Sequence, residues 1–229
     1  MGGCTGRERV KGDSKHGGGA WRETVVTTAG GHGRHVKQSG GHGQCAGCDV
    51  AVEALERGAG FEFVDKVVGG TVPRQFIASV ERGIRTQLEK GCIAGFPMTD
   101  LRVTLTGGKS HSVDSSDMAF QTAGALALKD AASEQTVTLL EPVDSVFVVV
   151  ADEYVGAVMT DLQTRRGRVV GTEPDTSGRS TIRAEVPQTE ITRYAIDLRS
   201  VSHGSGIFTR TPHGYERMPP NLVKAHRPD

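Results

Sequence analysis

Short stretches of alternating apolar and polar residues, or of clustered β-branched residues, mark the predicted strands in the first half of the chain. They lie at residues 22–28, 48–53, 61–64, 101–105 and 136–140. The glycine-rich run 30–43 predicts a long loop or the tip of a hairpin, because glycine adopts positive φ angles without strain. Gly107 and Gly108 predict a further turn.

Two helices are predicted among these strands. The first begins near Pro73, whose fixed φ suits a first helical turn, and ends at Gly91. Its apolar residues recur at helical spacing at Phe76, Ile77, Val80, Ile84 and Leu88. The second spans 115–132 and starts at the capping arrangement Asp114–Asp117. The stripe predicted to pack closely on a sheet is Met118, Ala119, Thr122, Ala123 and Leu126.

After Pro142 the elements follow a βαββαβ order, which is the split βαβ arrangement. Strands are predicted at 143–150, 168–173, 181–186 and 206–215, and helices at 152–166 and 189–198. The last strand contains Pro212, which an edge strand tolerates.

The chain is therefore expected to be an α+β protein with two domains, 20–140 and 143–220, joined by the linker Glu141-Pro142. Residues 1–19 have hardly any apolar side chain and are expected to form a disordered leader. Residues 221–229 are expected to be a tail.

Composition narrows the classes of partner. The 229 residues carry 27 basic and 27 acidic side chains, so attraction to a polyanion must come from a local surface. Aromatic residues make up only 5%, which argues against a sheet that stacks RNA bases on aromatic rings. No stretch is long and apolar enough to span a membrane, and the four scattered cysteines fit a reduced, cytoplasmic protein.

The segment Lys37–Gln44 is the first candidate for such a local surface. From Thr24 to Cys48 there is no Asp or Glu, whereas Arg34, Lys37 and three histidines fall in that window. Its glycines allow the backbone to approach a partner closely, and the charge suits an RNA backbone. From local chemistry alone, the alternative is a tight hairpin turn with incidental charge.

Motifs at separated places give this segment a context. In the first half they are Trp21-Arg22-Glu23-Thr24, the run Lys37–Gln44, the run Phe61–Gly70 and the run His111–Phe120. In the second half they are Leu139-Leu140-Glu141-Pro142, the run Gly156–Arg168, the run Tyr194–Ser200 and Gly204-Ser205-Gly206. Over about residues 20 to 220 and in this order, they resemble the C-terminal half of elongation factor G, its domains IV and V. The amino-acid sequences of several motifs are more similar to those of an elongation factor G-like paralogue than to those of the main translocase.

The resemblance implies a ribosomal-protein-like α+β domain with a left-handed βαβ crossover, followed by a ferredoxin-like domain. It also implies that the tip of the first domain reaches the decoding region of the small ribosomal subunit, and that the second domain docks on large-subunit RNA. The positions that match the tip are Lys37, Gln38, Ser39, Gly40, Gly41, His42, Gly43, Gln44 and His111.

Position 42 departs from the family pattern. Relatives usually carry Arg there, and His42 lacks the permanent charge and the bidentate fork of a guanidinium. The resemblance therefore implies a weaker, pH-dependent phosphate contact at this position. His111 would otherwise be a solvated loop histidine, and the resemblance favours a hydrogen bond to RNA phosphate or ribose.

Three arginines form a second candidate contact. Arg165, Arg166 and Arg168 lie at the C-terminal end of a predicted helix, where cations complement the helix dipole. Three cations exceed what that structural purpose needs, so contact with RNA by the second domain is the preferred interpretation.

The pair Cys45 and Cys48 suggests a metal site that His32, His35 and His42 could complete. A structural zinc site needs four ligands and there is no second cysteine pair, so no metal is expected. The resemblance implies an aromatic or other apolar residue near Cys45, which favours a buried strand cysteine.

The run Gly107–Ser110 looks like the end of a phosphate-binding loop, but Val103 stands where that motif needs glycine. Ser115 and Ser116 beside His111 are better used at a helix start than as nucleophiles. We therefore expect no catalytic residues and no GTP or other cofactor in this chain, although full-length relatives are GTPases.

The expected function is ribosome and rRNA binding by a monomeric, truncated elongation factor G-like protein without GTP hydrolysis of its own. One alternative is a remnant or part of a larger GTP-dependent elongation factor that is active only with the missing GTPase domain. A metal-binding module that uses Cys45, Cys48 and the nearby histidines is a third hypothesis.

Overall fold

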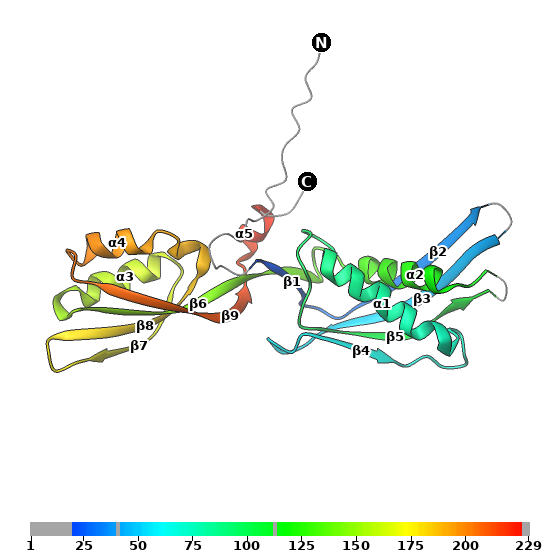
Figure 1. The fold of residues 1–229 in the computed structure, drawn as a ribbon, viewed down its shortest axis with the longest axis horizontal. Helices are drawn as coiled ribbons and strands as arrows, with labels where there is room; N and C mark the ends of the chain where they lie inside the picture. Colours follow the sequence, from blue (N-terminus) through cyan, green and yellow to red (C-terminus); the bar gives the residue numbers. More distant parts are fainter. Residues whose placement is uncertain (1–19, 40–41, 112–113, 226–229) are drawn as a thin grey trace, which may run out of the picture. The chain divides into compact units, whose positions relative to one another are not determined.

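The computed structural model describes residues 20–39, 42–111 and 114–225. The leader predicted for 1–19 lies outside the described residues. The chain forms two compact units, which are treated separately below (Figure 1). The first unit comprises Trp21–Glu141 with Tyr215–Asp229, and the second comprises Pro142–Gly214.

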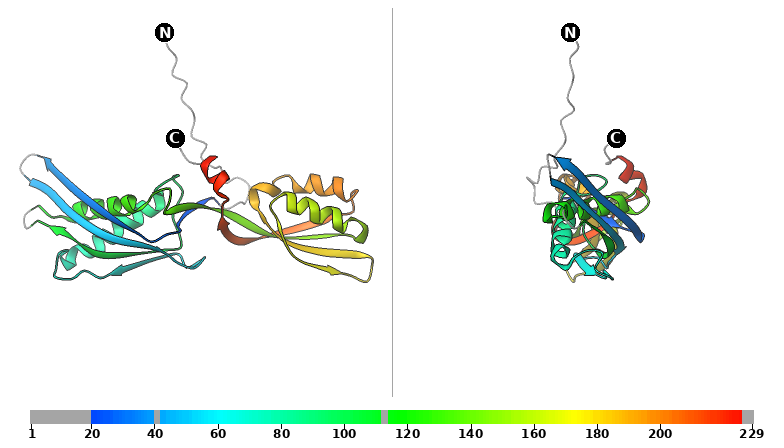
Figure 2. Two further views of the ribbon diagram at one scale, coloured as in Figure 1. Left: turned by 180° about the vertical axis from the view of Figure 1, so that it is seen from behind. Right: turned by 90° about the vertical axis from the view of Figure 1, so that its right-hand side faces the viewer.

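The first unit is built on a four-stranded sheet in the order β2-β3-β5-β4. Its strands are β2 (Ala29–Ser39), β3 (His42–Ala54), β4 (Phe61–Asp65) and β5 (Leu101–Ser110). Strands β4 and β5 are parallel, and helix α1 (Arg74–Lys90) joins them as the crossover of a βαβ unit. Helix α2 (Asp117–Ala131) follows β5 and packs with α1 on one face of the sheet (Figure 1 and Figure 2).

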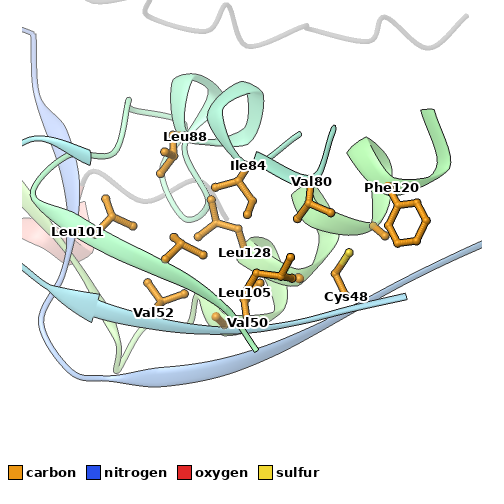
Figure 3. Close-up of a cluster of buried hydrophobic side chains, with 14 of the residues drawn as sticks. Cys48, Val50, Val52, Val80, Ile84, Leu88, Leu101, Leu105, Phe120 and Leu128 are labelled. Atoms are coloured by element: carbon orange, nitrogen blue, oxygen red, sulfur yellow. The ribbon is translucent and has the colours of Figure 1, made fainter. Parts of the chain in front are cut away.

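The core of the first unit lies between this face and the two helices. Figure 3 shows side chains of α1 pointing toward those of the strands, with Phe120 and Leu128 contributed by α2. The rings of Phe76 and Phe120 stack with centroids 4.7 Å apart, which joins the two helices. The alternation predicted for 48–53 is confirmed, because Val50 and Val52 are buried on the helix side of β3.

The glycine-rich run predicted as a loop is instead strand β2 and the start of β3, so that prediction is wrong for most of its length. The physical reason is packing. A Cβ atom on Gly31 would lie 2.1 Å from the carbonyl oxygen of Ala127, and one on Gly33 would lie 1.9 Å from that of Ala123. Glycine in β2 therefore lets the backbones of the strand and of α2 touch.

Helix α2 shows which small residues face the sheet. Ala119 and Ala123 are buried as predicted, but Met118 and Leu126 are 60% and 40% exposed, and Phe120 takes an inward position instead. The buried stripe of α2 is therefore rotated around the helix axis relative to the predicted stripe.

The turn predicted at Gly107 and Gly108 is also wrong, because both residues continue strand β5. A Cβ atom on Gly108 would lie 2.2 Å from the carbonyl oxygen of Gly47, so β3 and β5 approach closely there.

Two buried carboxylates hold loops of the first unit. Glu23, in β1 (Arg22–Val25), is fully buried and accepts hydrogen bonds at 2.7–3.2 Å from the backbone N–H groups of the run Cys92–Phe96. Asp100 accepts from the backbone N–H groups of Gly58 and Gly60 and pairs with Arg57 at 3.1 Å. Burial raises the pKa of Asp100, but these partners outweigh burial and hold the pKa below its ordinary value of 3.8.

Strand β6 (Val137–Ala151) runs through the predicted linker Glu141-Pro142, which is therefore not a loop. Its first residues pair with β1 up to Leu140, and its pairing with β8 begins at Val143. Pro142 has no N–H, and it is paired in neither the β1 ladder nor the β8 ladder.

The second unit has the predicted βαββαβ order. After β6 come a 3₁₀ turn (Asp152–Tyr154), α3 (Val155–Thr164), β7 (Arg168–Pro174), β8 (Arg179–Pro187), a second 3₁₀ turn (Gln188–Ile191), α4 (Tyr194–Val201) and β9 (Ile207–Arg217). The sheet order is β9-β6-β8-β7. This order and connectivity confirm the ferredoxin-like prediction.

The C-terminal segment differs from the predicted domain end at 220 and tail. Met218 donates a backbone hydrogen bond to Leu139, and α5 (Pro220–Ala225) buries Val223 in the same cluster of the first unit. Met218 and Val223 cover apolar side chains there, which explains why this segment belongs to the first unit rather than the second. Among the described residues, no helix has both the length and the apolar character that crossing a membrane requires.

Candidate nucleic-acid interface

The segment Lys37–Gln44, called the tip segment below, is the end of the β2–β3 hairpin. The two strands pair out to Ser39 and His42, and the exposed Lys37 lies opposite Gln44. Gly40 and Gly41, which the sequence places at the turn, lie outside the described residues. The continuous antiparallel pairing of β2 and β3 therefore places this predicted site at the far end of a long two-stranded ribbon.

The loop of His111 lies beside this hairpin, although the two are some seventy residues apart in sequence. Cys45 donates its backbone N–H to the carbonyl oxygen of Asp114 at 2.8 Å. The Ser115 hydroxyl donates to the carbonyl oxygen of Cys45 at 3.0 Å and accepts from the backbone N–H of His111 at 2.8 Å. The fold thus holds the His111 loop against the hairpin at Cys45, directly after the tip segment, and both segments lie at the same end of the first unit (Figure 1).

His111 is exposed, and its Nδ1 lies 3.4 Å from a carboxylate oxygen of Asp114. Ser115 fixes the backbone of the loop, and Ser116 caps α2 by accepting from the N–H of Ala119. Both serines therefore serve the helix start, as predicted. The cap itself is Ser116 rather than the predicted Asp114, because its side chain reaches the free N–H groups of the first turn.

Arg165 in the second unit is engaged inside the fold. Its guanidinium donates to both carboxylate oxygens of Asp161, to the carbonyl oxygen of Glu190 and to Asp197, all within 3.2 Å. It also lies 5.2 Å from the ring centroid of Tyr194. Four of its five N–H donors are in use, so its geometry fits a tie between α3 and α4.

Arg166 and Arg168 differ in exposure. Arg166 has a φ of 59° and pairs with Glu190 at 2.9 Å. Arg168 pairs with Glu185 from the start of β7, and 66% of its side chain is exposed. The structure therefore does not bring the three arginines together as one exposed patch, and Arg168 is the member best placed to meet a partner.

Cys45 and Cys48 point to opposite faces of β3, because they lie three positions apart along a strand. Cys48 is fully buried, and burial followed by the nearby charge of Asp49 raises its pKa to about 12. Within the three described ranges, no group of three or more His, Cys, Asp or Glu side chains is arranged to hold a metal ion.

Lys109 is a basic residue whose position the sequence did not reveal. It lies in β5 opposite Gly47, and Arg34 of β2 lies opposite Gly47 on the other side. A β-bulge in β5 sets this register, and no local sequence signal marks the bulge.

The first unit is thus an α+β unit that ends in a long hairpin, and the second unit is a split βαβ unit. Two family models match the chain: "Elongation factor G, domain IV" over residues 20–135 and "Elongation factor G C-terminus" over residues 138–226. The chain belongs to the elongation factor G family, which confirms the resemblance.

Relatives named elongation factor G-like protein match most of the chain. One from Mycobacterium tuberculosis (strain CDC 1551 / Oshkosh) is 63% identical over 198 residues, which cover 86% of this chain and 28% of the relative. One from Thermotoga maritima is 46% identical over 203 residues, covering 89% of this chain and 30% of the relative. The chain thus spans less than a third of their length.

A crystal structure of a protein from Thermus thermophilus has the same fold. It superposes with a TM-score of 0.79 at 36% identity, and the match covers 90% of this chain and 31% of that chain.

Proposed function

We propose that this chain is the ribosome-contacting C-terminal part of an elongation factor G-like translation factor. The observation that carries the proposal is the pair of hydrogen bonds that hold the His111 loop against the hairpin at Cys45, the residue directly after the tip segment. The two segments that the family resemblance assigns to one contact surface therefore lie at the same end of the first unit. The tip reaches the decoding region of the small subunit.

Charge supports an RNA partner for this end of the unit. The exposed Lys37 and His111 lie on the two joined segments, and neither the tip segment nor β2 contains an acidic residue. A phosphate backbone attracts such a surface and releases counterions when it binds. His42 stands where relatives carry Arg, so its contribution depends on pH.

The second unit docks on large-subunit RNA, and Arg168 is the most exposed of the three predicted arginines. Arg165 and Arg166 serve chiefly to hold α3 against the following segment. The proposal assigns binding alone to this chain, as a monomer, and places no step of GTP hydrolysis on its residues.

Sedimentation with purified ribosomes across a salt series tests the proposal. The wild-type chain is expected to co-sediment at low salt and to dissociate as salt rises. The variant Lys37→Ala with His111→Ala is expected to bind more weakly, and loss of the lysine alone should lower the salt slope by about 1.

The matched control is Lys90→Ala, an exposed lysine at the end of α1. That end lies beside the start of β5, because Met98 donates to the carbonyl oxygen of Leu88, whereas His111 follows the end of β5. Ribosome binding equal to that of the wild type is expected for the control. A folded wild-type chain that stays in the supernatant at low salt would falsify the proposal.

A further inference from the structure

The face of the first unit's sheet that lies away from α1 and α2 carries its charges in rows across the strands. Residues directly opposite each other on neighbouring strands point to the same side. In the row farthest from the tip, Arg102 lies between Glu53 and Glu62 and pairs with both at 2.8 Å. In the next charged row, His32 lies 2.6 Å from Asp49. Each row therefore contains at least as many acids as basic side chains.

The row nearer the tip has a different balance. Arg34 and Lys109 flank Gly47, both are exposed, and the row contains no acid. Neither cation has a hydrogen-bond or ion-pair partner within ranges 20–39, 42–111 and 114–225. Two strand spacings separate their Cα atoms, which corresponds to about 10 Å. The charged rows of the described sheet face therefore change from acid-containing to purely cationic in the direction of the tip segment.

A β-bulge creates this row. Leu105 pairs with Val50 and Gly107 pairs with Asp49, so Thr106 is an extra residue in β5. Without that insertion, residue 109 would have the same orientation as the buried Leu105, toward the helices. The bulge re-aims Lys109 to the open face, opposite the position that Arg34 reaches from β2.

Gly47 leaves the strip between the two cations without a side chain. A Cβ atom there would meet its nearest neighbours, the backbone nitrogen and the Cβ of Lys109, at 3.4 and 3.5 Å, which are ordinary contacts. Packing therefore does not demand glycine at this position. Gly47 itself is buried, and its effect is that no third side chain stands between the two exposed cations.

We infer that Arg34, Gly47 and Lys109 form a phosphate-binding track on the open sheet face, which carries a single RNA strand onward from the tip segment. The inference rests on the proposed function and extends its contact surface from the hairpin end to the sheet. No Phe, Tyr or Trp lies in these rows, and the row of Arg34 and Lys109 holds no ring, so the track holds the backbone rather than stacking bases, and it has no sequence preference.

Binding of fluorescent oligouridine and oligoadenosine to the full 229-residue chain tests the track. The variant Arg34→Ala with Lys109→Ala is expected to bind both about tenfold more weakly at low salt. Its log–log salt slope is expected to fall by about 1.4, which corresponds to two lost phosphate contacts on a single strand. The control variant Arg82→Ala with Lys90→Ala removes two exposed cations from α1, on the other face, and is expected to match the wild type.

A second variant, Gly47→Glu, places an acid between the two cations and leaves both in place. It is expected to weaken oligonucleotide binding as strongly as the double variant. If the double variant does not fold, this second variant still tests the track. A wild-type salt slope in either folded variant overturns the track. If the wild-type chain binds ribosomes but does not bind the oligonucleotides, the track is also overturned, whereas the proposed function stands.

Competition with oligoglutamate separates RNA from an acidic protein as the occupant. If oligoglutamate binds through Arg34 and Lys109 while the oligonucleotides do not, the RNA assignment is overturned. A wild-type chain that binds neither ribosomes nor oligonucleotides removes the proposed function and the track together.

Discussion

Gly33 of β2 faces the backbone of Ala123 in α2 so closely that a Cβ atom on the glycine would lie 1.9 Å from the alanine carbonyl oxygen. The same Cβ atom would lie 2.4 Å from the backbone nitrogen of Ala127. The glycines next to the tip segment thus have a structural task, and the flexibility of the ribbon is not their main role.

Replacing Gly33 with alanine is expected to destabilise the first unit by about 1–3 kcal/mol or more, because rigid backbone on both sides must move apart. Gly30→Ala is the matched control in the same strand, since a Cβ there meets its nearest atom at 3.8 Å. Urea unfolding of both variants measures the difference. Equal unfolding midpoints would show that α2 does not press on β2 as described.

Replacing Glu23 with glutamine is expected to lower the free energy of unfolding by about 3 kcal/mol. The amide keeps the shape of the carboxylate but loses its charge and one acceptor, so buried N–H groups of the run Cys92–Phe96 lose a partner. Glu89→Gln, at an exposed position on α1, is the control and is expected to unfold like the wild type. Thermal unfolding in which Glu23→Gln matches this control would contradict the role of Glu23 as the anchor of that loop.

Asp100 is expected to make stability depend on pH on the acid side. Its folded pKa lies below the ordinary 3.8, so its contribution is fully present above about pH 4 and is lost as pH falls through the folded pKa. Asp100→Asn keeps a residue that tolerates the local φ of 60° and removes the charge.

The variant is therefore expected to be less stable than the wild type at pH 7, and the difference is expected to shrink below about pH 4. Urea unfolding at about pH 7, 4 and 3 measures it. A difference that stays constant across these values would mean that the carboxylate charge of Asp100 contributes nothing.

Substitution of Arg165 is expected to lower the stability of the second unit, whereas substitution of Arg168 is expected to weaken ribosome binding. Arg165→Ala leaves Asp161 and Asp197 without their shared partner and is expected to destabilise the second unit by about 2 kcal/mol. Arg168→Ala is expected to leave unfolding unchanged and to weaken ribosome binding at low salt. Parallel unfolding and sedimentation measurements check both. The reverse pattern would restore Arg165 as an RNA contact and remove Arg168.

Cys45 and Cys48 are expected to behave as independent thiols rather than as a metal pair. Elemental analysis of the purified chain is expected to find no stoichiometric zinc, because opposite faces of one strand cannot present both sulfurs to one ion. Cys48 is expected to react with a thiol reagent only after unfolding, since it is buried and its pKa is raised to about 12. One bound zinc per chain that is lost in Cys48→Ser would contradict this.

The sequence predicted most of the strands and helices because each presents an apolar pattern of its own. Local periodicity predicted the buried positions Val50 and Val52 of β3 and the apolar face of α1 from Phe76 to Leu88. It also predicted the βαββαβ order of the second half. Family motifs then predicted that the tip segment and His111 belong to one site, and this assignment and the roles of these residues stay predictions.

Tertiary structure decided the features that depend on a neighbour distant in the chain. The sequence around Gly33 predicts a loop, and only the packing of Ala123 against it explains the glycine. The sequence around Lys109 also predicts a turn, whereas the bulge at Thr106 places Lys109 on the same sheet face as Arg34. Arg165 looks like a free cation until α4 brings Asp197 to it. Periodicity records which face of an element is buried, whereas backbone contacts, register shifts and ion pairs between elements exist only once the elements have packed.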